Sequence, residues 1–422
     1  MVNYSLESLG QSFRSGNHPT EMELELEMAS IRDGMSELGA ESDMLDRAFN
    51  SAELAMNIIK NFKDEDQCLE LLKCQATMES LINVNGGIID DLTVSAAQEG
   101  IKEFFKTVWE KIKAFFAKLW DYIKRFFTWL GEKFGLIKDK GTKIKEALGK
   151  VDKNKFNQAL LEYKPNAKNS ASNESLMPGL EDYSDIRNAT VELLPANVMD
   201  KLTSDLAAVV HDGDFILKSP ELKPFVAAAE LMEKDITSVD ISRLNDIRDG
   251  LDKLLHGTKL VFVKGCITVV IERGELNITT SVRFDKSKQT ASMYDLGYRS
   301  VEQVQQIVYR IIRISQVMYE SKKPWTVEKF EQKLASERLS DMAVSLELSD
   351  EADEKGRVIA SIFRAQGRIL AVLNKMCMKS SETLGRILGH EYVVFKDVLS
   401  EAGAPLDFKY SMLEFTNNTL PE

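Results

Sequence analysis

The chain has few of the residues that build metal sites, disulfide frameworks and tight turns. Its 422 residues include four cysteines, four histidines and nine prolines. The cysteines show no CxxC spacing, and the histidines are scattered singly. These spacings argue against a zinc site and a disulfide framework, and they favour a reducing compartment. The low proline count, together with only 23 glycines, favours a mainly helical fold.

Long apolar runs are also missing. No stretch of about 18 uncharged apolar residues occurs, so we expect no transmembrane helix. The N-terminal sequence "MVNYSLESLGQSF" has neither the basic nor the apolar segment of a secretory signal. From these absences we expect a soluble protein.

Motifs that carry catalysis are absent from the sequence. It contains no GxxxxGK[ST], HExxH or GxSxG motif and no paired Cys/His cluster. Arg357, Arg364 and Arg368 fall on one predicted helix, which we interpret as a solvated face, with phosphate contact as the alternative. We therefore expect a non-enzymatic protein with no cofactor, no metal ion and no small-molecule substrate.

Helical patterns dominate the rest of the chain. They cover Glu21 to Phe62 and most of the C-terminal half, where helices are expected at 355–388 and 391–402 among others. A segment at about 259–284 is rich in Val, Ile and Thr and predicts two or three antiparallel strands. We predict a mainly α fold: a helical bundle-like C-terminal domain with a small antiparallel β insertion, preceded by a long amphipathic helix and an acidic helical N-terminal region.

Composition divides the chain into four regions. A stretch rich in Ser, Asn and Pro, without periodicity, is the best linker candidate. The predicted regions are an acidic helical region at 1–99, a basic amphipathic aromatic region at 100–163, the linker at 164–185, and an α-rich globular domain at 186–422.

Charge is distributed unevenly between the first two regions. Residues 1–100 contain 19 acidic and 6 basic residues, a net charge of −13. Residues 101–155 contain 15 basic and 7 acidic residues, a net charge of +8. The sign changes at Glu99-Gly100. An acidic segment placed directly before a basic one can fold over it, or neutralise it until the acidic segment is removed.

An eleven-residue repeat follows the change of sign. From Glu103 the blocks are EFFKTVWEKIK, AFFAKLWDYIK and RFFTWLGEKFG. Eleven residues make three turns of about 3.67 residues, so each position of the repeat stays on one side of a helix. The pattern predicts a helix of some 35 residues, at about 101–135, with a basic face and a wide apolar stripe. The candidate interaction residues on it are Phe104, Phe105, Trp109, Phe115, Phe116, Trp120, Phe126, Phe127 and Trp129.

The apolar stripe has two interpretations. In the first, the stripe packs on the protein's own core, as the stripes of most amphipathic helices do. Alternatively, it forms a surface for a membrane, a partner helix or a self-assembling lattice, since Trp and Phe opposite Lys are typical of interfacial helices. Low exposure of Trp109 and Trp120 would favour the first interpretation.

The residues before the repeat, Ala97-Gln98-Glu99-Gly100, complete a resemblance. An acidic N-terminal region that ends in small-x-Glu and precedes a Phe/Trp/Lys helix resembles internal head (virion structural) proteins of giant tailed bacteriophages. In that group a prohead protease cuts after the Glu of small-x-Glu and removes acidic propeptides. The resemblance implies a cut after Glu99. Triplets of the same kind also occur elsewhere, at Gly39-Ala40-Glu41, Ser51-Ala52-Glu53, Ser172-Asn173-Glu174 and Gly179-Leu180-Glu181.

The resemblance implies a function and a location. The chain would be a virion protein of the capsid interior, made in the host cytoplasm with a cleavable acidic propeptide. Its partners would be the prohead protease and other virion or capsid proteins, with packaged DNA or a membrane surface as further candidates. The alternative function is a peripheral membrane protein that binds lipid through the helix at 101–135.

Overall fold

The computed structural model of the chain describes residues 19–60, 73–74, 94–162, 196–211, 217–233, 239–256, 259–264, 267–273, 278–284, 301–320 and 350–406. Helix predominates among these residues, which confirms the mainly α fold class predicted from the sequence. The predicted linker at 164–185 lies outside the described residues.

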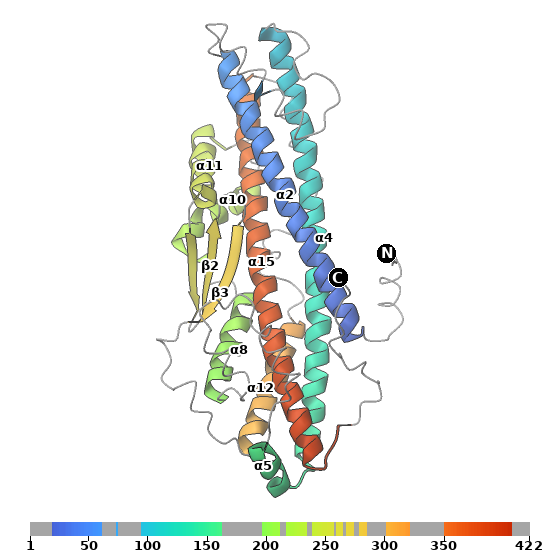
Figure 1. Ribbon diagram of the computed structural model, residues 1–422. Coiled ribbons are helices and arrows are strands. Elements are labelled where there is room, and N and C mark those ends of the chain that lie inside the picture. The colour runs from blue at the N-terminus through green and yellow to red at the C-terminus, as the bar shows by residue number, and fades with distance from the viewer. Residues whose placement is uncertain are drawn as a thin grey trace.

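Three long helices form the body of the protein. They are α2 (Glu21–Lys60), α4 (Val94–Leu148) and α15 (Asp350–Glu401). Figure 1 shows them side by side along an elongated bundle, and each packs against the other two. Two shorter helices, α12 (Val301–Glu320) and α5 (Lys153–Glu162), complete this side of the molecule, and α12 packs along α4.

A second layer lies across α15 from α2 and α4 (Figure 1). It contains a small sheet and four short helical segments: α8 (Ala196–His211), η1 (Pro220–Leu222), α10 (Lys223–Glu233) and α11 (Ile241–His256). The strands are β1 (Lys259–Lys264), β2 (Ile267–Arg273) and β3 (Ile278–Phe284), joined antiparallel in the order β1-β2-β3. The register pairs Val261 with Val270 and Val269 with Val282, and β3 lies against α15.

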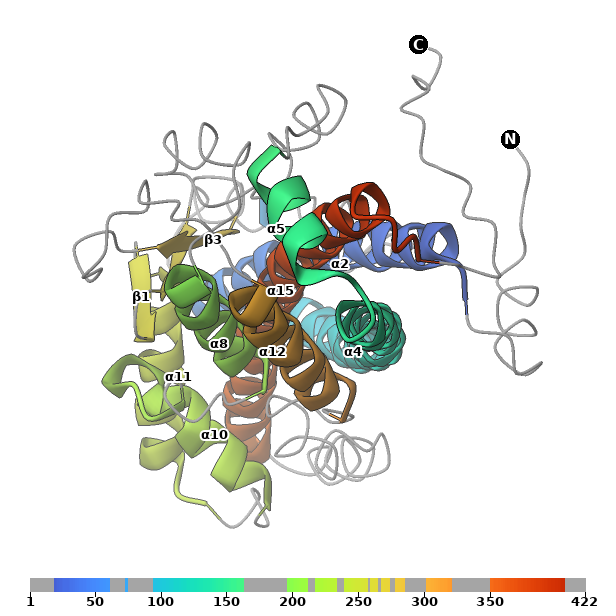
Figure 2. The ribbon, with the colours of Figure 1, turned by 90° about the horizontal axis from the view of Figure 1, so that it is seen from below.

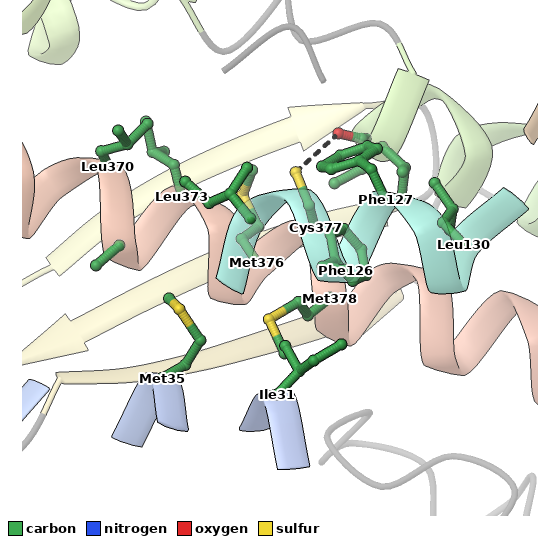
Figure 3. Packing of buried hydrophobic residues seen from close by; sticks show 14 of the residues in the cluster. Ile31, Met35, Phe126, Phe127, Leu130, Leu370, Leu373, Met376, Cys377 and Met378 are labelled. Atoms are coloured by element: carbon green, nitrogen blue, oxygen red, sulfur yellow. Dashed lines mark hydrogen bonds between the residues drawn. The ribbon is translucent and has the colours of Figure 1, made fainter. Parts of the chain in front are cut away.

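One hydrophobic cluster runs through the described residues. It extends from Leu24 to Ala402, so the N-terminal acidic region, the aromatic helix and the C-terminal region contribute to a common core. Figure 2 looks along the bundle and shows α15 between α2 and α4 on one side and α8 and the sheet on the other. Figure 3 shows part of the core, where Ile31 of α2 faces Met378 of α15 beside Phe126 of α4.

The long helices exceed the lengths predicted from the sequence. The aromatic helix has 55 residues rather than some 35, and it extends beyond 101–135 at both ends. The helices predicted at 355–388 and 391–402 are a single helix of 52 residues. The sequence Gly389-His390 does not end α15, because a glycine costs only about 1 kcal/mol in a helix. The buried side chains of Leu388 and Tyr392 on either side offset that cost.

A capping box fixes the start of α2. The Thr20 backbone N–H donates to the Glu23 carboxylate at 2.7 Å, and the Glu23 N–H donates to Thr20 Oγ1 at 3.3 Å. This reciprocal pair satisfies two backbone donors that a helix N-terminus leaves free. The sequence Thr-x-x-Glu sets the residue at which α2 begins.

Candidate functional site

The aromatic stripe of α4 faces inward. Five of its predicted interaction residues are buried: Phe115, Phe116, Phe126, Phe127 and Trp129. Trp120 is partly buried and packs at the edge of the core. Phe104, Phe105 and Trp109 lie in the first turns of α4, and their side chains are outside the described part of the chain. In the described part of α4, the stripe therefore packs on the protein's own core.

The stripe meets α15 at a glycine. A Cβ atom added to Gly367 would lie 2.8 Å from the ring of Phe115 and 2.9 Å from the ring of Phe116. Both distances are shorter than carbon atoms tolerate in a packed core. The absence of a side chain at Gly367 is what lets the paired phenylalanines of α4 approach α15.

Helix α2 covers the rest of the stripe. Phe126 stacks on Trp129 with ring centroids 6.0 Å apart. The Trp129 indole N–H donates a buried hydrogen bond to the Leu24 carbonyl at 2.8 Å. A side chain at Gly34 would overlap the ring of Tyr122, so α2 and α4 approach closely at that point. The acidic region thus covers the aromatic face of the basic helix.

Charge complements this packing along α4. Helix α2 carries ten acidic and three basic residues, a net charge of −7. Arg125 of α4 donates to both Glu27 carboxylate oxygens, at 2.8 and 3.2 Å, and to Ser30 Oγ at 3.0 Å. Four further ion pairs join the two helices: Lys118–Glu41 at 2.8 Å, Lys133–Glu25 at 2.8 Å, Lys133–Glu21 at 3.5 Å and Lys140–Glu21 at 3.0 Å.

A second row of ion pairs joins α2 to α15. Arg364 binds Asp46 at 2.7 Å, and its guanidinium lies 4.3 Å from the centre of the Phe49 ring. Arg368 pairs with both Asp43 and Asp46. The interpretation of Arg364 and Arg368 as a solvated helix face is therefore wrong, because both side chains are largely covered by α2. Their positive charge is matched by carboxylates more than 300 residues earlier in the chain.

One carboxyl group between α2 and α4 lacks such a match. Glu132 Oε2 is buried without a hydrogen-bond partner among the described residues. Burial, and then the negative charge of Glu27, raise the pKa of Glu132 to about 7. By contrast, burial raises the pKa of Glu21, but Lys140 and Lys133 outweigh it and hold that pKa below its ordinary value. The interface therefore contains carboxyl groups whose pKa values are shifted in opposite directions.

The predicted cleavage sequence lies inside a helix. Ala97, Gln98, Glu99 and Gly100 belong to the first two turns of α4, which begins at Val94. The triplets that end at Glu41 and Glu53 lie within α2. From the sequence, Ala97 to Gly100 were expected before the helix, because the eleven-residue repeat becomes regular only from Glu103.

No group of three or more His, Cys, Asp or Glu side chains suited to a metal ion occurs in the described part of the chain. Among the described helices, none combines the length and the apolar character needed to cross a bilayer. The interface of α2 with α4 and α15 is therefore the candidate functional site.

Comparison with known proteins gives one match. The model of the family "phiKZ-like phage internal head proteins" matches residues 72–370, which is well over half of the chain. The chain belongs to this family. No curated protein and no solved structure matched it.

As an internal head protein, the chain resides in the interior of the phage head and has a virion structural role. It associates there with other virion components. The family match begins at residue 72, so α2 lies before it, whereas α4, α12 and the first part of α15 lie within it. The resemblance, which was drawn from residues 1–135, is thus confirmed by a family match that lies mainly after residue 135.

The partners of the basic residues were not predicted from the sequence. An acidic region next to a basic one is evident there, but no pattern singles out Glu27, Asp43 or Asp46. The available signal was the reversal of net charge at Glu99, which predicts contact between the regions but not the residues that make it.

Proposed function

We propose that the chain enters the assembling head with residues 1–99 as an acidic propeptide, which is removed by a cut after Glu99. In the uncut chain, α2 shields the aromatic face of α4 and the arginines of α15. The observation that carries this proposal is the double row of ion pairs that α2 makes over a buried aromatic stripe.

The charge balance supports a protective role for α2. Removing a net charge of −13 from a chain of net charge −12 leaves a mature chain near +1. A protein of net charge near zero is easier to hold beside packaged DNA than one that is strongly acidic. Before packaging, the acidic region keeps the chain soluble and its cations occupied.

The location of Glu99 is compatible with a cut. A protease binds its substrate in an extended form, so the first turns of α4 have to open. The first four N–H groups of a helix have no intrahelical partner, so its first turn opens more readily than its middle. Glu41 and Glu53 lie in the interior of α2, where opening disrupts more of the core.

The mature surface then packs against other proteins of the head. We do not propose the peripheral membrane role, because part of the stripe, at Phe115 and Phe116, packs against Gly367 of α15 and not only under α2, so a lipid surface would have to compete with that contact. DNA is a less suitable partner for the same stripe, because its phosphates provide no apolar surface against which aromatic side chains can pack.

Co-expression with the head protease of the same phage tests the cut. The wild-type chain should shorten to a product that begins at Gly100. The Glu99→Gln variant should stay uncut at this position, whereas the matched Glu53→Gln variant should be cut like the wild type. Equal cutting of the Glu99→Gln variant at Gly100, or a wild-type chain that stays intact, would refute the proposal.

A further inference from the structure

A cut after Glu99 does not by itself uncover the surface under α2. Helix α2 ends at Lys60, so the cut breaks none of its described contacts. Its inner face consists of buried apolar side chains: Leu24, Met28, Ile31, Met35, Leu38, Leu45, Ala48, Phe49, Ala52, Ala55 and Ile58. Each of them favours the docked state by removing apolar surface from water. After the cut, α2 remains as a helix bound without a covalent link.

The groove that holds α2 has a defined chemistry. Its floor is apolar and aromatic, with Phe126 and Trp129 of α4 and Met378 of α15. One wall presents cations of α4, among them Arg125 and Lys133. The opposite wall presents Arg364 and Arg368 of α15.

This arrangement selects one class of occupant. An apolar floor between two cationic walls matches a helix with an apolar stripe and carboxylates along both borders of that stripe, as in helix-in-groove recognition. Helix α2 has this pattern: Glu27 and Glu41 face α4, and Asp43 and Asp46 face α15. A nucleic acid would neutralise the walls but leave the aromatic floor without an apolar partner.

We propose that the groove between α4 and α15 is a binding site for an acidic amphipathic helix of another head protein, and that α2 occupies the site as a competing ligand until that helix displaces it. The opening of the site in the head rests on the proposed removal of residues 1–99. The recognition itself depends only on the groove.

A full-length chain with an engineered cut tests retention of α2. A site for a sequence-specific protease is inserted at Gly87, between α2 and α4 in the sequence, and the chain is cut there. The proposal predicts that the N-terminal fragment co-elutes with the remainder in gel filtration at physiological salt. Separation of the two fragments without any competitor would overturn it.

A labelled peptide of residues 21–60, added to the cut chain, tests the chemistry of the site. It should exchange into the groove and raise the fluorescence anisotropy. A peptide with Ile31→Asp and Phe49→Asp should compete at least 100-fold more weakly. A peptide with Asp43→Asn and Asp46→Asn should compete about tenfold more weakly.

A matched control removes two charges from the exposed face. The peptide with Asp33→Asn and Glu37→Gln should compete within twofold of the wild-type peptide, since both side chains are exposed. Equal competition by all four peptides, or displacement of the peptide by a DNA duplex of equal charge, would overturn the proposal in favour of a general polyanion site. Because the engineered cut does not involve Glu99, failure of the proposed maturation would leave these results unaffected.

Discussion

Glu132 makes the stability of the protein depend on pH. Its pKa is about 7 in the folded chain and near the ordinary 4.5 when unfolded, so the folded state binds more protons between these values. The contribution of Glu132 to the free energy of unfolding is therefore fully present below pH 4.5 and is lost as the pH rises towards 7.

Replacing Glu132 with glutamine should remove this loss. The Glu132→Gln variant should match the wild type near pH 4.5 and exceed its free energy of unfolding above pH 7 by about 1–2 kcal/mol, a value reduced because the side chain is partly solvated. Urea unfolding at several pH values measures the difference. A difference that stays constant across this window would contradict the explanation.

Gly367 and Gly385, both in α15, should respond oppositely to alanine. A Cβ at Gly367 meets the rings of Phe115 and Phe116, so Gly367→Ala should lower the free energy of unfolding by about 1–2 kcal/mol through overpacking. A Cβ at Gly385 meets no described atom within 4 Å. Gly385→Ala should therefore raise the free energy of unfolding by about 0.5–1 kcal/mol through helix propensity. Denaturant unfolding of both variants checks the signs, and equal signs would refute the packing argument.

At the scale of elements, the pairing of α2 with α15 is testable by a double-mutant cycle. Asp46 and Arg368 have side chains that are 16% and 14% exposed. The variants Asp46→Asn and Arg368→Gln should show a coupling energy of about 1–3 kcal/mol in unfolding experiments, because each single change removes one partner from a largely buried group of charges.

The pair Lys153–Glu302 provides the control for this cycle. Its side chains are 66% and 61% exposed, and its N–O distance is 2.9 Å. An exposed pair of this kind should couple by less than about 0.5 kcal/mol. Similar coupling energies for the two pairs would show that burial by α2 is not what strengthens the inner one.

The local pattern of the sequence predicts where helices form better than it predicts which helices pack against one another. The start at Glu21 follows from capping, and the apolar stripe of α4 follows from the eleven-residue period, which leaves open whether the stripe faces the core or a partner. The contact between Asp46 and Arg368 does not, because no local spacing relates residues that are more than 300 positions apart. The same limit explains Arg364, which looks solvated on α15 alone and becomes covered only when α2 is in place.

Helix ends were the least predictable part of each element. Helix α15 continues through Gly389 because buried residues on both sides offset a small local cost. Such compensation depends on tertiary packing, which a window of sequence does not contain.

At the scale of the whole molecule, regions of opposite charge share one core. The acidic region, the basic helix and the C-terminal helices contribute to a single hydrophobic cluster. The proposed cut after Glu99 thus separates two parts of the chain that share one folded core. Residues 1–99 leave only if the contacts of α2 are also broken, which makes assembly with another head protein the natural trigger.

The N-terminal residue of the protein in purified virions tests the central claim most directly. Mass spectrometry of mature particles should find Gly100 as the N-terminus and no abundant peptides from residues 1–98. Abundant peptides from that region in mature particles, with Met1 or Val2 as the N-terminus, would contradict the removal of the acidic helix.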